Sequence, residues 1–358
     1  MSAHEILIAV MAVFALLGAV DRIIGNRFGL GQEFENGIQA MGALALAMLG
    51  IISLAPVLAA VLKPVVVPVF GFLGADPAMF AGTILACDMG GGALAAEMSS
   101  DPRAAMLGGV ITGSMLGATL VFTIPAAMGI LNPEDRAPMA KGILCGIVTI
   151  PVGILVGGLV AGYPVLMVLR NLLPIVIIGL LIALGLWKLE KAMINGFVLF
   201  GKGVVILITL GLAAAIVEAL TGFALIPGME PLETGFQTVG SIAIVLAGAF
   251  PLVYTVTKLF RKPLMKLGKL LGVNDVAAAG LVATLANSIA TLGMVKDMDR
   301  RGKVVNIAFA VSAAFVFGDH LGFTAGFAPE LLPAMILGKL AAGITAVAVA
   351  LWLTKKEK

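Results

Sequence analysis

Long apolar stretches follow one another along the whole chain and are separated by short polar segments. Each stretch comes near the ~20 residues that a helix needs to cross a bilayer. The eleven stretches lie at about 5–24, 37–61, 77–97, 104–131, 140–161, 165–187, 195–219, 235–259, 273–294, 303–327 and 334–353. Read as strict alternation, they predict an all-α polytopic membrane protein with eleven crossings.

The basic residues of the polar segments contradict eleven crossings. Segments 258–271 and 295–303 hold five and four Lys or Arg residues, yet they flank one apolar stretch, 273–294. Basic loops favour the cytoplasmic side, so both flanks are expected there. We therefore predict that 273–294 enters the membrane and returns as a re-entrant hairpin, broken at the polar pair Asn287 and Ser288.

A second hairpin is predicted at 77–97, whose centre reads "CDMGGG". Asp88 is followed there by Gly90 and Gly91, and glycine permits a turn of the backbone. Backbone that leaves helical geometry at membrane depth needs partners from protein, water or substrate. The alternative is a kinked full span with a packed aspartate. The prediction is thus about nine spanning helices and two re-entrant hairpins, with the N-terminus outside and the C-terminus, "TKKEK", in the cytoplasm.

The chain also matches itself at a shift of 198 residues. Polar matches at this shift are Glu35 with Glu233, Gln39 with Gln237, Asp101 with Asp299, Arg103 with Arg301 and Lys141 with Lys339. The shift covers an odd number of predicted crossings, so the repeats, about 5–161 and 195–353, are expected to be inverted. Segment 165–187 is the linking helix, and 1–358 forms a single transmembrane domain. Secondary transporters with this architecture hold substrate between interrupted helices.

Composition supports a membrane protein and excludes several other classes. Hydrophobic residues make up 60% of the chain, charged residues 12%, and the mean hydropathy is +1.12. The basic residues are distributed as topology signals, so no nucleic-acid partner is expected. Cys87 and Cys145 lie in apolar stretches, where we expect no disulfide. The chain lacks a nucleotide-binding loop, "HExxH" and Cys-x-x-Cys, so we expect no enzyme, no cofactor and no metal.

Four long stretches closely resemble the ethanolamine utilisation permease family. They read "GQEFENGIQAMGALALAMLGIISLAPVLA", "GADPAMFAGTILACDMGG", "AAAGLVATLANSIATLGM" and "FAVSAAFVFGDHLGF". The resemblance covers nearly the whole chain. It implies a multi-pass protein of the bacterial inner membrane, surrounded by the lipid bilayer, that moves ethanolamine into the cytoplasm. A homodimer is a further expectation from family-like permeases.

Ionisable residues inside apolar stretches are candidates for the site, because they are costly in a membrane. Ethanolamine is an ammonium with a hydroxyl group, and Asp88 is expected to face the ammonium. Asp319 offers a second anion and His320 a proton carrier, or the two satisfy each other between packed helices. Asn287 and Ser288 either contact the hydroxyl or cap two half-helices. Gly90 and Gly91 are expected to turn backbone carbonyls toward the ligand.

Gln39 and Gln237 begin symmetry-related spans and are also candidate site residues, with structural pairing as the other role. The alternative function is a sodium/proton antiporter, whose site would also hold paired acids at broken helices. Uptake down the membrane potential and co-transport with a proton or sodium ion both remain open. Lys339 is assigned no chemistry, because it is expected to snorkel to a membrane surface.

Overall fold

The computed structural model describes residues 2–355, apart from the side chains of 260–262, 264 and 267–269, and this part of the chain forms helices joined by short turns. The α-helices are α1 Ala3–Ile23, α2 Leu30–Phe72, α3 Ala78–Ile84, α4 Gly91–Met98, α5 Pro102–Met106, α6 Ile124–Ile130, α7 Arg136–Ile147, α8 Ile150–Val160, α9 Val165–Lys188, α10 Glu190–Thr221, α11 Leu232–Leu271, α12 Asp275–Ala286, α13 Ser288–Met294, α14 Arg300–Ala313, α15 Asp319–Phe327 and α16 Leu332–Leu353. Short 3₁₀ helices are η1 Cys87–Met89, η4 Pro133–Asp135, η5 Val295–Asp297 and η6 Pro329–Leu331, and π-helical segments are η2 Leu107–Gly117 and η3 Thr119–Thr123. The all-helical fold class is confirmed.

Eight helical stretches in the described part are long and apolar enough to cross a membrane. They differ sharply in burial. In the apolar 18-residue window of Pro102–Ile130, 94% is buried inside the protein, whereas the share for Ala3–Ile23 is 17%. Pro102–Ile130, which includes η2 and η3, is therefore the core around which the other helices pack.

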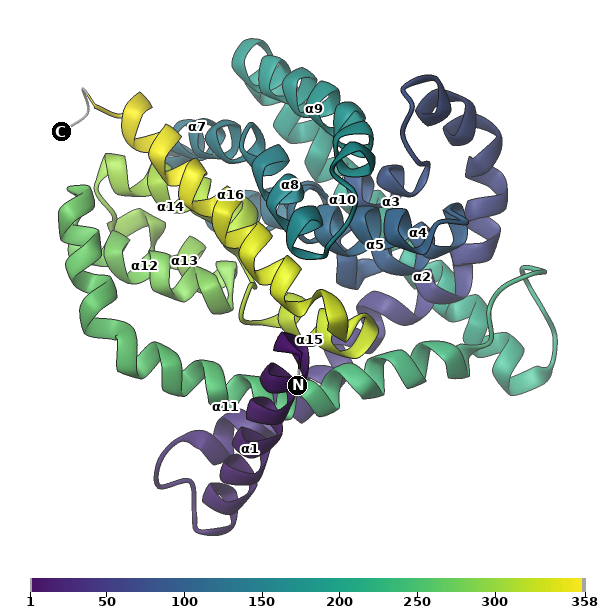
Figure 1. The fold of residues 1–358 in the computed structure, drawn as a ribbon, viewed down its shortest axis with the longest axis horizontal. Coiled ribbons are helices and arrows are strands. Elements are labelled where there is room, and N and C mark those ends of the chain that lie inside the picture. The colour runs from purple at the N-terminus through teal and green to yellow at the C-terminus, as the bar shows by residue number, and fades with distance from the viewer. Residues whose placement is uncertain (1, 356–358) are drawn as a thin grey trace.

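Two long helices, α2 and α11, pack against each other. α2 has 43 residues, which at about 1.5 Å per residue gives a length of roughly 65 Å, about twice the hydrocarbon core. The sequence predicts that the spans end near residues 61 and 259. The helix instead continues through Pro64 and Pro68 in α2 and through Pro263 in α11. α11 (green) runs along the lower edge of the molecule and turns upward at the left (Figure 1).

The stretches 77–97 and 273–294 are each interrupted near the centre. α3 and α4 pack against each other around residues 85–90, and α12 packs against α13 around Asn287. Gly90 has a φ of 89°, which the absence of a Cβ permits. Asn287 is the N-cap of α13, and its Oδ1 accepts the Ile289 amide at 2.8 Å. Both interruptions therefore lie where Gly and Asn interrupt the apolar pattern.

A third interruption divides the stretch 303–327, which the sequence predicts as one continuous span. α14 ends at Ala313 and α15 begins at Asp319. In the turn between them, the amide of Phe315 donates to Thr284 O at 3.2 Å and that of Phe317 to Leu285 O at 2.8 Å. Backbone groups of α12 thus replace the helical partners that the turn loses.

Contacts between helices recur at the shift of 198 residues. A Cβ on Gly37 of α2 would lie 2.5 Å from the Ala247 amide of α11, and one on Gly235 of α11 would lie 2.6 Å from the Leu49 side chain of α2. Leu49 and Ala247 are themselves 198 positions apart. Contacts in which each member of a pair touches the counterpart of the other are typical of a two-fold axis.

Candidate functional site

Asp88 lies in η1, where the chain passes from α3 to α4. Its Oδ1 is 3.7 Å from His320 Nε2 and 3.9 Å from Cys87 Sγ. His320 belongs to the first turn of α15 and is 2% exposed. The break at 85–90 and the break at 314–318 therefore bring one carboxylate and one imidazole together, although the two residues are far apart in the sequence.

A cavity of about 40 Å³ lies between these breaks. A cavity needs about 10–15 Å³ to hold one water molecule, so this one has room for a few water-sized groups. It is lined by Ala86, Asp88, Met89, Ala118, Phe122, Phe315, Asp319 and His320. The walls thus combine two carboxylates and an imidazole with apolar and aromatic groups.

Two phenyl rings form the aromatic part of the wall. The ring centroids of Phe122 and Phe315 are 5.5 Å apart at an interplanar angle of 75°, and Phe315 lies 5.3 Å from the His320 ring. Phe315 has a φ of 61°, in the left-handed region that is strained for a residue with a Cβ. Strained conformations of this kind cluster at functional sites. Aromatic faces also attract cations, so the rings suit an ammonium.

Asp319 lines both the small cavity and a larger one of about 420 Å³. The larger cavity is lined by Glu33, Phe250, Val253, Tyr254, Thr257, Lys258, Ala286, Asn287, Phe317, Gly318 and Asp319. Two carboxylates, those of Glu33 and Asp319, lie on its wall. The two cavities thus share Asp319 on their walls, and the carboxylates of the larger one suit a cationic solute.

Lys339 is the residue that the sequence reasoning missed. It lies on α16 with 0% exposure, and its Nζ donates to the carbonyl of Ser114 in η2. Its ammonium acts electrostatically on Asp88. The available signal was its position inside the stretch 334–353, because an ionisable residue within a membrane span is a candidate for a functional site.

The other predicted residues lie at different distances from the cavity. Asn287 lines the larger cavity and caps α13, while the Ser288 hydroxyl is buried without a hydrogen-bond partner in the described structure. Gly90 packs against Ile51, and a Cβ on Gly91 would lie 2.7 Å from Ala86 O; neither glycine lines the cavity.

Gln39 and Gln237 are exposed on α2 and α11 and are not brought into the cavity. The side-chain Nε2 of Gln39 donates to Glu35 Oε1 of its own helix at 3.1 Å. In the structure, therefore, neither glutamine is placed with Asp88 and His320.

One group of side chains has the spacing of metal ligands. The ligand atoms of Cys87, Asp88 and His320 all lie within 4.8 Å of one another. Thiolate, imidazole and carboxylate together suit a zinc-like divalent ion. The buried Lys339 interacts electrostatically with both Cys87 and Asp88, and in its protonated form it would oppose the binding of such an ion.

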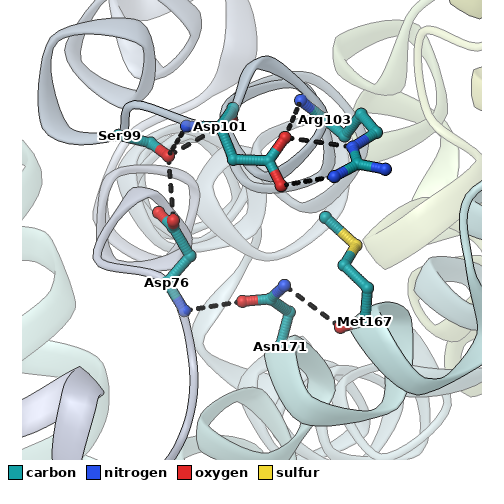
Figure 2. Close-up of polar contacts among 6 residues, drawn as sticks. All are labelled: Asp76, Ser99, Asp101, Arg103, Met167 and Asn171. Carbon is teal, nitrogen blue, oxygen red and sulfur yellow. Dashed lines mark hydrogen bonds and ion pairs between the residues drawn. The ribbon is translucent and has the colours of Figure 1, made fainter.

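Hydrogen bonds close the base of the α3–α4 pair, as Figure 2 shows. The Asp76 amide donates to Asn171 Oδ1 of α9 at 2.7 Å, and Ser99 Oγ donates to Asp76 Oδ2 at 2.8 Å. Asp101 donates its amide to Ser99 Oγ at 3.0 Å and pairs with Arg103 at 3.1 Å. The ends of this pair are thus fastened to each other and to α9, away from the break that carries Asp88.

Comparison with known proteins gives the family. The profile described as "Ethanolamine utilisation protein, EutH" matches residues 3–353. The chain belongs to this family. It is 59% identical over 356 residues to "Probable ethanolamine permease EutH" of Listeria monocytogenes serotype 1/2a, covering 99% of this chain and 95% of the relative. It is 50% identical over 395 aligned positions to the protein of the same name from Escherichia coli K12, covering 100% and 97%.

A relative from Bacillus subtilis strain 168, "Uncharacterized protein YxeR", is 54% identical and covers 100% of this chain and 96% of its own length. No solved structure matches the chain. The resemblance found in the sequence is therefore confirmed. The EutH family is named as a permease family, which together with the eight apolar helices makes this chain a multi-pass membrane protein that is a transporter and not an enzyme.

Proposed function

We propose that this EutH-family protein is a secondary transporter that moves protonated ethanolamine into the bacterial cytoplasm. The observation that carries the proposal is the small cavity between helix breaks, with Asp88, Asp319 and His320 on its wall beside Phe122 and Phe315. The names of the relatives, probable ethanolamine permeases, support the substrate. The family resemblance supports ethanolamine as the substrate, and the carboxylates and phenyl rings of the cavity suit its ammonium group.

In the proposed complex, Asp88 faces the ammonium group of ethanolamine. An ionised carboxylate in a membrane interior is costly unless a positive charge balances it, and the substrate supplies such a charge. The phenyl ring of Phe315 adds an aromatic face. The imidazole of His320, whose Nδ1 is buried without a partner in the described structure, contacts the substrate hydroxyl. The cavity volume suits a molecule with a two-carbon chain.

The transport mechanism rests on two inverted repeats that move relative to each other around this cavity. The repeated contacts between α2 and α11 support the repeats, as do Gly74 and Gly272, which share a φ of 70° at positions 198 apart. In this proposal the pairs α3–α4 and α12–α13 are re-entrant hairpins. The N-terminus is outside and the C-terminus is in the cytoplasm, as the basic loops predict.

Calorimetry with purified full-length protein tests the proposal. Asp88→Asn keeps the shape of the side chain and removes its charge, so it should weaken ethanolamine binding by at least about tenfold, or about 1.4 kcal/mol. Glu97→Gln is the matched control, since Glu97 is exposed on α4, and it should leave the affinity unchanged. Unchanged affinity in a folded Asp88→Asn protein would contradict the proposed role of Asp88.

A sodium/proton antiporter is the competing function, and the same protein distinguishes it. An antiporter with paired acids would change the pH inside vesicles when sodium is added, and ethanolamine would not bind. Ethanolamine binding without a sodium-dependent pH change is the expected result. The opposite result would favour the antiporter.

A further inference from the structure

Lys339 is held next to the break that carries Asp88. Its Nζ donates to the Ser114 carbonyl, and Gly113, the preceding residue of η2, packs against Cys87: a Cβ on Gly113 would lie 3.1 Å from the Cys87 amide nitrogen. Cys87 directly precedes Asp88. Lys339 itself does not line the small cavity. The buried ammonium is therefore a fixed part of the wall behind the site, and not a ligand that the substrate touches.

The net charge around the cavity depends on the ionisable groups of Asp88, Asp319 and Lys339. Asp88 interacts electrostatically with Asp319 and with Lys339. When Asp88 and Asp319 are ionised, Lys339 is protonated, and His320 and Cys87 are neutral, these five groups carry one net negative charge. One monovalent cation neutralises this charge, while a dication would leave an uncompensated positive charge in a buried site, which is strongly unfavourable.

We propose that Lys339 is a resident counter-charge that sets the site to accept one monovalent ammonium and to exclude dications. This inference rests on the proposed function and deepens it, because it assigns the selectivity of the same site to a residue that the substrate does not contact. The excluded dications include diamines. They also include divalent metal ions, for which Cys87, Asp88 and His320 would otherwise offer ligand atoms within 4.8 Å of one another.

Two variants separate the charge of Lys339 from its hydrogen bond. Lys339→Gln keeps a donor for the Ser114 carbonyl but removes the positive charge, so the two carboxylates should then favour a dication. Adding Asp319→Asn to Lys339→Gln returns the net charge to one negative unit. The double variant should therefore recover the preference for a monovalent cation, which a purely structural role of Lys339 would not produce.

Competition binding to the purified full-length protein measures this preference. The probes are 3-amino-1-propanol and 1,3-diaminopropane, which have the same chain length and carry one and two positive charges at neutral pH. In the wild type the diamine should bind at least about tenfold more weakly than the amino alcohol. In Lys339→Gln the ratio of the two dissociation constants should shift by at least about tenfold toward the diamine, and zinc binding should appear.

Lys202→Gln is the matched control, because Lys202 is exposed on α10, and it should leave the ratio unchanged. If folded Lys339→Gln leaves the ratio unchanged while the wild type still binds ethanolamine, the proposed role of Lys339 is wrong but the proposed function stands. Wild-type protein that binds neither ethanolamine nor the amino alcohol would overturn the proposed function as well. If Lys339→Gln does not fold, the ratio of the two dissociation constants in the wild type tests the proposal. Equal affinity for the amino alcohol and the diamine would contradict it.

Discussion

Gly90 is the position where a single methyl group should disturb the candidate site most directly. Gly90 has a φ of 89°, and a Cβ there would lie 2.1 Å from Cγ2 of Ile51. An L-residue in the left-handed region costs roughly 1–2 kcal/mol, and overpacking a buried contact adds about 1–3 kcal/mol. Gly90→Ala should therefore destabilise the protein by roughly 2–5 kcal/mol.

Gly74→Ala is the matched control. Gly74 also has a positive φ, 70°, but a Cβ there would meet nothing within 4 Å, so only the backbone cost of roughly 1–2 kcal/mol remains. Unfolding in detergent, followed by intrinsic fluorescence, should rank the melting temperatures as wild type, Gly74→Ala and Gly90→Ala, from highest to lowest.

A double-mutant cycle with Ile51→Ala isolates the steric part. Ile51→Ala removes the methyl and methylene groups that the new Cβ would meet, so the double variant should lose less stability than the sum of the two single losses. Equal melting temperatures for Gly90→Ala and Gly74→Ala, or additive losses in the cycle, would refute the packing that the structure shows around η1.

Three further predictions concern stability, topology and coupling. Asp135→Asn removes the partner of Lys303 from an ion pair in which the Asp135 side chain is 2% exposed; breaking a buried pair costs about 3–5 kcal/mol, so the melting temperature in detergent should fall markedly, and an unchanged value would contradict the burial. Single cysteines at the exposed positions Lys266 and Lys296, in a protein without its native cysteines, should react with an impermeant thiol reagent from the same side; opposite sides would exclude the hairpin α12–α13. His320→Gln should abolish the pH dependence of uptake if the imidazole carries a coupling proton, and an unchanged pH profile would make His320 a structural residue.

Much of the site could be predicted because its residues conflict with their surroundings. Asp88 and Asn287 stand out in apolar stretches, where a charged or polar group is costly unless it has a partner. The structure interrupts a helix at both places. Asp319 and His320 were found in the same way, and the structure places both on the wall of the cavity with Asp88.

The break between α14 and α15 was not predicted, because the residues of the turn itself are apolar. Residues 314–318 read Ala-Phe-Val-Phe-Gly, an apolar run that fits a membrane helix. The turn depends on carbonyl groups of α12, which accept the amides of Phe315 and Phe317. Partners supplied by a distant segment of the chain leave no local signal. For Lys339 the sequence could not show the acceptor, because the Ser114 carbonyl is remote in sequence.

In α2 and α11 the sequence predicted an end where the structure has a continuous helix. The apolar stretch was expected to end near residue 61, and Pro64 and Pro68 follow it; proline removes a helical hydrogen bond. Membrane helices tolerate proline where neighbouring helices, side chains or small local adjustments satisfy the freed carbonyl groups. α2 packs closely against α10 and α11, and the helix continues to Phe72.

Uptake of labelled ethanolamine by proteoliposomes tests the central claim most directly. A membrane potential is worth about 2.3 kcal/mol per charge per 100 mV, so a potential that is negative inside should drive the protonated substrate into vesicles containing the wild-type protein. Vesicles with Asp88→Asn should accumulate no more label than empty vesicles, while Glu97→Gln should match the wild type. Equal uptake by Asp88→Asn and wild type, or no uptake by the wild type with any imposed gradient, would contradict a transporter built around Asp88.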